Sequence, residues 1–302
     1  MTVVQPIERM FIITNQSKNP STPLSMPQRI RTTPPPRVRT AADGSEAPRL
    51  VPAAERAVRL IDHLAQRDRP IGLAELSRAL QFPKSSLHGL LLTLTTLGVL
   101  VRTPDGGHAL GPRVLQWAGG LGSPSALIQA FQALSVQQPS LRREALMLAV
   151  LDGDDVVYLA CQPGNTPLAV NFRVGGRLPA CCTSSGKAML ATLPDEQVIA
   201  MMGNGGLRRL TPHSVDSIDA LLAQLRRIRE LGHAIDDEET AEGMHCFAAA
   251  IRHAGQPVWA PAAVATSLIK ATVTPERAAD VARAIQALAR QISARLGVPD
   301  PA

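Results

Sequence analysis

The stretch that decides the N-terminal fold is LAELSRALQFPKSSLHGLLLTLTTLGVLVRTPDGGHAL, residues 73–110. Leucines recur at helical spacing within residues 73–80 and again within residues 87–94, so each run has one apolar face. Pro83 separates the runs, because proline disfavours helical backbone in the residue before it. Gly98 is suited to end the second helix, since glycine adopts the left-handed conformation found there. The pattern predicts two short helices joined by a short turn.

A hairpin follows these helices. Residues 99–101 predict a strand, Asp105-Gly106-Gly107 a tight turn and residues 108–110 the returning strand. Two helices across a short turn, followed by a hairpin, are typical of a winged helix-turn-helix. The second helix of that motif usually lies in the major groove of DNA.

The charge distribution supports DNA binding. Residues 49–122 carry nine Lys or Arg and five Asp or Glu, whereas residues 123–302 carry sixteen and seventeen. Cations and short hydroxyls at the start of the second helix are suited to phosphates and base edges. The predicted DNA contacts are Arg56, Lys84, Ser85, Ser86, His88 and Arg102.

The chain divides into four predicted segments. Residues 1–48 form a basic, proline-rich tail expected to be disordered, and a dispensable extension is favoured over an arm that touches DNA phosphates. Residues 49–111 form the winged helix-turn-helix domain, and residues 112–123 form a linker helix with Pro112 in its first turn. Residues 124–302 form the second domain.

The second domain predicts an α+β fold around an antiparallel sheet, because strands in hairpins alternate with groups of helices. The predicted strands are residues 146–151, 156–161, 168–173, 246–252 and 258–266. The predicted helices are residues 184–193, capped by a hydroxyl, 218–231, ended by Gly232, and 274–296.

The chain carries seven motifs, which in order are ERAVRLIDHLA, LAELSRAL, FPKSSLHGLL, GHALGPRVL, RLPACCTSSGKAMLA, RIRELGHAIDDEE and GMHCFAAAI. Together they resemble the IclR family of bacterial transcription regulators. The resemblance covers about residues 53–297. It implies a winged helix-turn-helix followed by a GAF-like domain that binds a small metabolite, often an organic acid. It also implies a homodimer or homotetramer that binds a double-stranded DNA operator as repressor or activator.

The predicted effector site starts at the helix after residue 183. Backbone N–H groups there, with the hydroxyls of Thr183, Ser184 and Ser185, suit a carboxylate. The resemblance adds Asp236 and Cys246 as pocket residues. From the residues alone, Asp236 is more simply a solvated loop acid and Cys246 a small buried hydrophobe.

Two departures from the family pattern affect these expectations. Ala263-Val264-Ala265 stands where family members commonly carry serines, so Ala263 and Ala265 predict an apolar pocket wall and a ligand with an apolar body. Gly89 replaces the usual arginine after His88 in the DNA-reading helix. This loss leaves open a second interpretation, a small-molecule-binding protein with degenerate DNA binding.

An enzymatic reading is disfavoured. Ser184 and Lys187 have the Ser-x-x-Lys spacing of some hydrolases, but the accompanying Ser-Asp-Asn and Lys-Thr-Gly elements do not occur. A zinc site from Cys181, Cys182, His245 and Cys246 is also disfavoured, because adjacent cysteines cannot easily both reach a tetrahedral ion. We therefore expect no enzymatic activity, no metal and no cofactor.

The composition also predicts where in the cell the protein is found. No apolar run reaches the roughly 18 residues that span a bilayer, so we expect no membrane association. Four cysteines without a framework spacing favour free thiols in a reducing cytoplasm.

Overall fold

The computed structural model describes residues 50–119, 124–165, 174–202, 206–252 and 261–298. The predicted tail at 1–48 and the predicted strand at 168–173 lie outside these ranges, as do the first residues of the predicted strand at 258–266.

The N-terminal domain has the predicted winged helix-turn-helix. Its elements are α1 (Pro52–Ala65), α2 (Leu73–Leu80), α3 (Lys84–Thr96), β1 (Leu100–Arg102) and β2 (His108–Leu110). The strands β1 and β2 pair antiparallel across the predicted turn. Gly98 follows α3 with a φ of +73°, as expected for a glycine that ends a helix.

The turn between α2 and α3 is fixed locally. Gln81 ends α2 in the left-handed conformation, with a φ of 57°, and the Ser77 hydroxyl donates to the carbonyl oxygen of Phe82 at 2.8 Å. Leu76 and Leu87, one from each helix, are fully buried in the domain core. Burying a leucine contributes roughly 1.5–3 kcal/mol, so this core holds α3 against α2.

Two helices lie between the wing and the sheet in the sequence. The helix α4 (Arg113–Gly119) lies within the predicted linker, and α5 (Pro124–Ser135) begins the second domain. A short 3-10 helix, η1 (Pro139–Leu141), then leads into the sheet.

The second domain contains a six-stranded antiparallel sheet in the order β5-β4-β3-β8-β7-β6. The strands are β3 (Ala145–Asp152), β4 (Asp155–Gln162), β5 (Arg177–Pro179), β6 (Ala234–Asp237), β7 (Met244–Ile251) and β8 (Ala262–Ile269). This architecture confirms the predicted α+β class. Both edge strands, β5 and β6, are short, and the sequence pattern did not indicate them.

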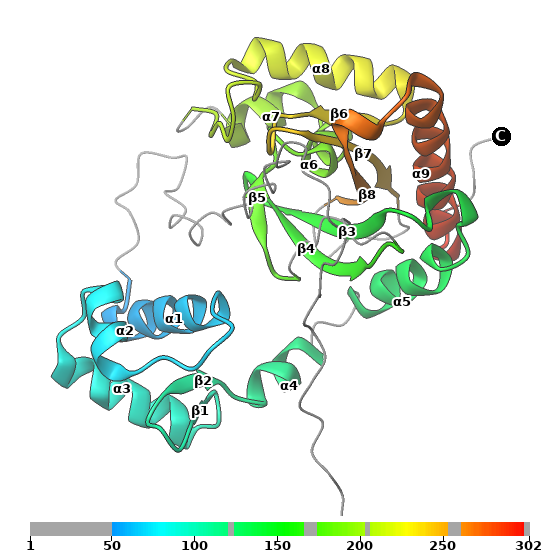
Figure 1. The fold of residues 1–302 in the computed structure, drawn as a ribbon. Helices are drawn as coiled ribbons and strands as arrows, with labels where there is room; N and C mark the ends of the chain where they lie inside the picture. The colour runs from blue at the N-terminus through cyan, green and yellow to red at the C-terminus, as the bar shows by residue number, and fades with distance from the viewer. Residues whose placement is uncertain (1–49, 120–123, 166–173, 203–205, 253–260, 299–302) are drawn as a thin grey trace, which may run out of the picture.

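Helices cover both faces of this sheet (Figure 1). One face packs against α6 (Ser184–Leu190), α7 (Asp195–Met202) and α8 (Ile218–Leu231), and the other packs against α5 and α9 (Pro275–Arg295). A second 3-10 helix, η2 (Lys270–Thr272), precedes α9. Because both faces are covered, β3, β7 and β8 are apolar along most of their length and show little alternation.

Candidate DNA interface and effector site

The first turn and a half of α3 presents polar groups to solvent. Lys84, Ser85, Ser86 and His88 are all exposed, while Leu87 between them is buried in the domain core. Pro83 precedes the helix and offers no side-chain cap. The free N–H groups of this helix start are therefore suited to a phosphate, and the exposed side chains to a DNA groove.

The two remaining predicted DNA contacts lie on other elements. Arg102 is exposed at the end of β1, in the wing, and Arg56 is half-buried on α1. Gly89 is exposed on α3, and a Cβ atom built on it would have no atom within 4 Å. Glycine is therefore not required at this position by packing.

The predicted anion site corresponds to the start of α6. Thr183 is the N-cap of this helix, and its Oγ1 accepts a hydrogen bond from the Gly186 N–H at 3.0 Å. Ser184 and Ser185 occupy the first two helical positions and are 3% and 1% exposed. The predicted hydroxyl cap is confirmed, and the cap is Thr183.

Three of the polar side chains beneath α6 form one row across the sheet. Asp236 on β6 pairs with Cys246 on β7, and Cys246 pairs with Ser267 on β8. Neighbouring strands are about 4.8 Å apart, so the three side chains lie side by side. The structure thus brings together Asp236 and Cys246, two of the predicted pocket residues.

The apolar wall is only partly as predicted. Ala263 and Ala265 are buried on the sheet face that α6 covers. Ser267, two residues further along β8, lies on the same face, because side chains alternate along a strand. Its Oγ is buried and has no hydrogen-bond partner among the described residues. The sequence pattern predicted this strand to end at residue 266, so it did not indicate this hydroxyl.

The interpretation of Asp236 as a solvated loop acid is wrong. The residue lies on β6 and is 1% exposed. Its Oδ1 accepts hydrogen bonds from the N–H groups of Glu239 at 2.8 Å and Thr240 at 3.1 Å. Burial raises the pKa of Asp236, and these two hydrogen bonds oppose that rise.

Tyr158 on β4 is a further polar residue that sequence reasoning missed. It is 4% exposed and belongs to the core beneath α6. Burial raises the pKa of the Tyr158 phenol, while a hydrogen bond with Ser185 lowers it. A phenol therefore meets a hydroxyl of α6 at the predicted site.

A buried ion pair supports the site from within α6. Lys187 is 0% exposed, and its Nζ donates to a carboxylate oxygen of Glu239 and, at 2.9 Å, to Oε1 of Gln224. Glu239 belongs to the same segment as Asp236, so this pair joins α6 to the end of β6. Burial raises the pKa of Glu239, and Lys187 lowers it.

The contacts of Lys187 weaken the interpretation of Ser184 and Lys187 as a hydrolase pair. The Lys187 amine is held by Glu239 and Gln224, so the Ser-x-x-Lys spacing does not provide a free base for Ser184.

Among the described residues, no group of three His, Cys, Asp or Glu side chains could hold a metal ion. None of the described helices combines the length and apolarity needed to cross a membrane.

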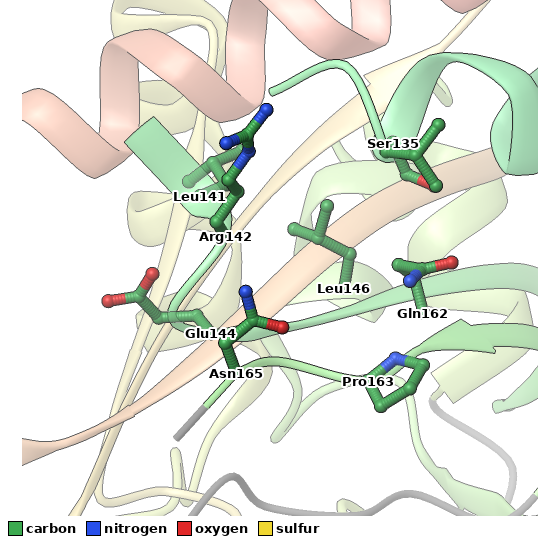
Figure 2. Close-up of a pocket in the computed structure, with 9 residues that line it drawn as sticks. Ser135, Leu141, Arg142, Glu144, Leu146, Gln162, Pro163 and Asn165 are labelled. Atoms are coloured by element: carbon green, nitrogen blue, oxygen red, sulfur yellow. The ribbon is translucent and has the colours of Figure 1, made fainter. Parts of the chain in front are cut away.

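A separate pocket of about 230 Å³ lies where β3 begins and β4 ends (Figure 2). It is lined by Ser135, Val136, Leu141, Arg142, Glu144, Leu146, Gln162, Pro163 and Asn165. Leu146 belongs to the core that α9 covers, so this pocket is not the site beneath α6.

Comparison with known proteins identifies the class. Residues 53–104 match the IclR helix-turn-helix domain, and residues 130–294 match the bacterial transcriptional regulator IclR C-terminal domain. The chain therefore belongs to the IclR family of transcriptional regulators, as its resemblance predicted. Members of this class are DNA-binding regulators with an effector-binding C-terminal domain, and they are not enzymes.

Individual relatives agree with this assignment. The chain is 31% identical over 222 residues to the “Probable transcriptional regulator SauR” of Cupriavidus necator, covering 73% of this chain and 88% of SauR. It is 36% identical to the repressor BlcR of Agrobacterium tumefaciens, with a TM-score of 0.54 over 83% of this chain and 99% of BlcR. An IclR homologue from Microbacterium hydrocarbonoxydans, solved with 4-hydroxybenzoate, shares the fold with a TM-score of 0.69 at 23% identity, covering 81% and 98%.

Proposed function

We propose that this regulator binds its DNA operator through α3 and the wing, and that a small carboxylate with an apolar body controls that binding from beneath α6. The observation that carries the effector proposal is the buried polar cluster of Tyr158, Ser185, Asp236, Cys246 and Ser267. Within this cluster the Ser267 Oγ is buried and has no hydrogen-bond partner among the described residues, and a polar guest would supply one.

The chemistry of the cluster favours an acid. The N–H groups at the start of α6 and the Ser184 and Ser185 hydroxyls are donors, which suits a carboxylate. Ala263 and Ala265 supply an apolar surface on the opposing sheet. A hydroxyl elsewhere on the guest would donate to Asp236. These features together favour a hydroxylated or aromatic carboxylic acid.

The pocket in Figure 2 is a weaker candidate for the effector. Its one cation, Arg142, is exposed, and a solvent-exposed charge contributes little to holding a carboxylate. The Glu144 carboxylate is also paired with Arg277 at 2.5 Å. We use Arg142 as the matched control for the effector site.

We also infer that the protein acts as a homodimer or homotetramer. A helix-turn-helix domain of this size contacts one half-site, and two-fold symmetric proteins bind palindromic operators with two such domains. This inference rests on the family relationship. Analytical ultracentrifugation of the full-length protein tests it, and a monomer at micromolar concentration would contradict it.

The DNA interface is tested with two variants of α3. Ser86→Ala should weaken operator binding by about 1–3 kcal/mol and affect random DNA little, because a base contact is lost. Lys84→Ala should weaken binding to both and reduce the slope of log affinity against log salt by about one unit. Fluorescence anisotropy with genomic fragments selected by the protein measures both effects.

The same titrations separate the two functional interpretations. If wild-type protein enriches no genomic fragment and binds all DNA equally weakly, the chain is a small-molecule-binding protein with degenerate DNA binding. Equal losses on operator and random DNA for Ser86→Ala would mean that this serine positions the protein and does not read sequence.

The effector proposal is tested by thermal shift of the full-length protein with a panel of carboxylic acids, including 4-hydroxybenzoate, and with the corresponding amides. A ligand at 100 times its Kd should stabilise the protein by about 2.7 kcal/mol. We expect acids to raise the Tm and amides of the same shape to raise it much less. Equal shifts from acids and amides would contradict an anion site.

A further inference from the structure

Two adjacent cysteines lie directly before the effector helix. Cys181 and Cys182 are 2% and 0% exposed, and their Sγ atoms are 3.8 Å apart. Both sulfurs lie within hydrogen-bond distance of the same acceptor, the carbonyl oxygen of Arg208, at 3.7 and 3.1 Å. The two sulfurs are therefore held together beneath the backbone of a single loop.

We propose that Cys181 and Cys182 form a modification site, which a small hydroperoxide oxidises to a disulfide between the adjacent residues. The two Sγ atoms, which are 3.8 Å apart, would need to approach to about 2.05 Å, the length of a disulfide bond. The pair lies beneath the Arg208 backbone, so the oxidant must be small and must enter when this loop opens.

The chemistry balances with one hydroperoxide. The Cys182 thiolate attacks the peroxide O–O bond, forming a sulfenic acid while the leaving oxygen takes a proton and departs as water or an alcohol. The Cys181 thiol then attacks the sulfenic sulfur, so that an S–S bond forms, the S–O bond breaks, and the leaving hydroxyl takes the thiol proton and departs as water. Two thiols are oxidised and one peroxide is reduced.

The environments of the two thiols assign these roles. A hydrogen bond from Cys181 lowers the pKa of Cys182, although burial opposes this, and Ser214 and the Leu210 backbone also lower it. The same hydrogen bond raises the pKa of Cys181, together with burial. These directions favour Cys182 as the thiol that ionises and attacks and Cys181 as the resolving thiol, an assignment that the Cys181→Ser variant tests.

Disulfide formation would alter the peptide between the two cysteines. Cα atoms of adjacent residues are about 3.8 Å apart across a trans peptide, below the 4.4–6.8 Å usual for a disulfide. The peptide must therefore twist. Its Cys182 N–H donates to Pro179 O at 3.2 Å, and the Cys182 carbonyl accepts from Thr240 Oγ1 at 3.2 Å.

The twist would reach two parts of the effector site. Thr183, the cap of α6, is the next residue, and Thr240 donates its N–H to Asp236. Oxidation is therefore expected to loosen the start of α6 and the segment after β6. A consequence for ligand affinity rests on the proposed function, whereas the disulfide itself does not.

The test uses full-length, fully reduced protein treated with hydrogen peroxide and then alkylated under denaturing conditions. Wild type should lose two of its four alkylatable thiols. The peptide that contains both cysteines should lose about 2 Da, and dithiothreitol should restore it. The Cys161→Ser variant keeps both adjacent cysteines and should likewise lose two of its three alkylatable thiols. Cys181→Ser should instead accumulate a sulfenic acid that dimedone traps.

Hydrogen exchange tests the structural consequence. In oxidised wild type, amides of residues 183–190 and 236–243 should exchange at least about threefold faster, with no change in residues 84–96. A disulfide that involves another cysteine or a second chain would overturn the proposal, as would four intact thiols after peroxide treatment. Unchanged exchange in the oxidised protein would overturn the coupling to α6.

Discussion

Replacing Lys187 with methionine should lower the free energy of unfolding of the second domain by about 3–5 kcal/mol, because the change leaves the Glu239 carboxylate buried and unpaired. Methionine has a similar length, so packing in α6 is largely kept. Both side chains are buried, and the second oxygen of Glu239 has no hydrogen-bond partner among the described residues. Urea unfolding followed by circular dichroism measures the change.

A second substitution provides the control. In the Lys187→Met, Glu239→Gln double variant, the buried charge is removed, and most of the loss should be recovered. Additive losses would show that the two side chains do not interact. A loss below about 1 kcal/mol in Lys187→Met would show that the carboxylate finds water or another cation.

Replacing Gly186 with alanine should destabilise the second domain by about 3 kcal/mol or more. The new Cβ would lie 2.6 Å from the carbonyl carbon of Ala180, and closer still to its Cα and oxygen. Those are backbone atoms on a buried segment, so no flexible side chain can move aside. The start of α6 would have to shift away from the sheet, and ligand stabilisation should fall with it.

Gly89→Ala is the matched control, because this glycine also lies in a helix but has open space around it. Alanine there should stabilise the N-terminal domain by about 0.5–1 kcal/mol. Thermal unfolding measures the change in stability that each substitution causes relative to wild type. Similar effects of both substitutions would show that α6 can relax around an added methyl group.

Local features of the fold could be predicted from the sequence. The N-terminal domain follows from helical leucine spacing, Pro83 and a glycine-rich turn, all of which act within a few residues. The helix α8 was predicted with the observed bounds, because its apolar stripe ends at Gly232. Such signals need no information about distant parts of the chain.

The effector site depends on contacts that no local pattern specifies. Asp236, Cys246 and Ser267 meet only through the pairing of three strands. A run of four acids such as residues 236–239 resembles a solvated loop, and only the packing of α6 over β6 shows that Asp236 is buried. Lys187 and Glu239 are 52 residues apart in sequence. Residues 234–237 and 177–179 are too short to show a strand pattern.

The most direct test of the account compares two variants with the most stabilising carboxylate from the panel. Ser185→Ala removes the hydroxyl that meets Tyr158 beneath α6, and Arg142→Ala removes the cation of the pocket in Figure 2. Thermal shift at one ligand concentration should show that Ser185→Ala loses about 1.4 kcal/mol of ligand stabilisation, equivalent to tenfold in affinity, while Arg142→Ala retains the wild-type shift. A wild-type shift in Ser185→Ala together with its loss in Arg142→Ala would contradict an effector site beneath α6.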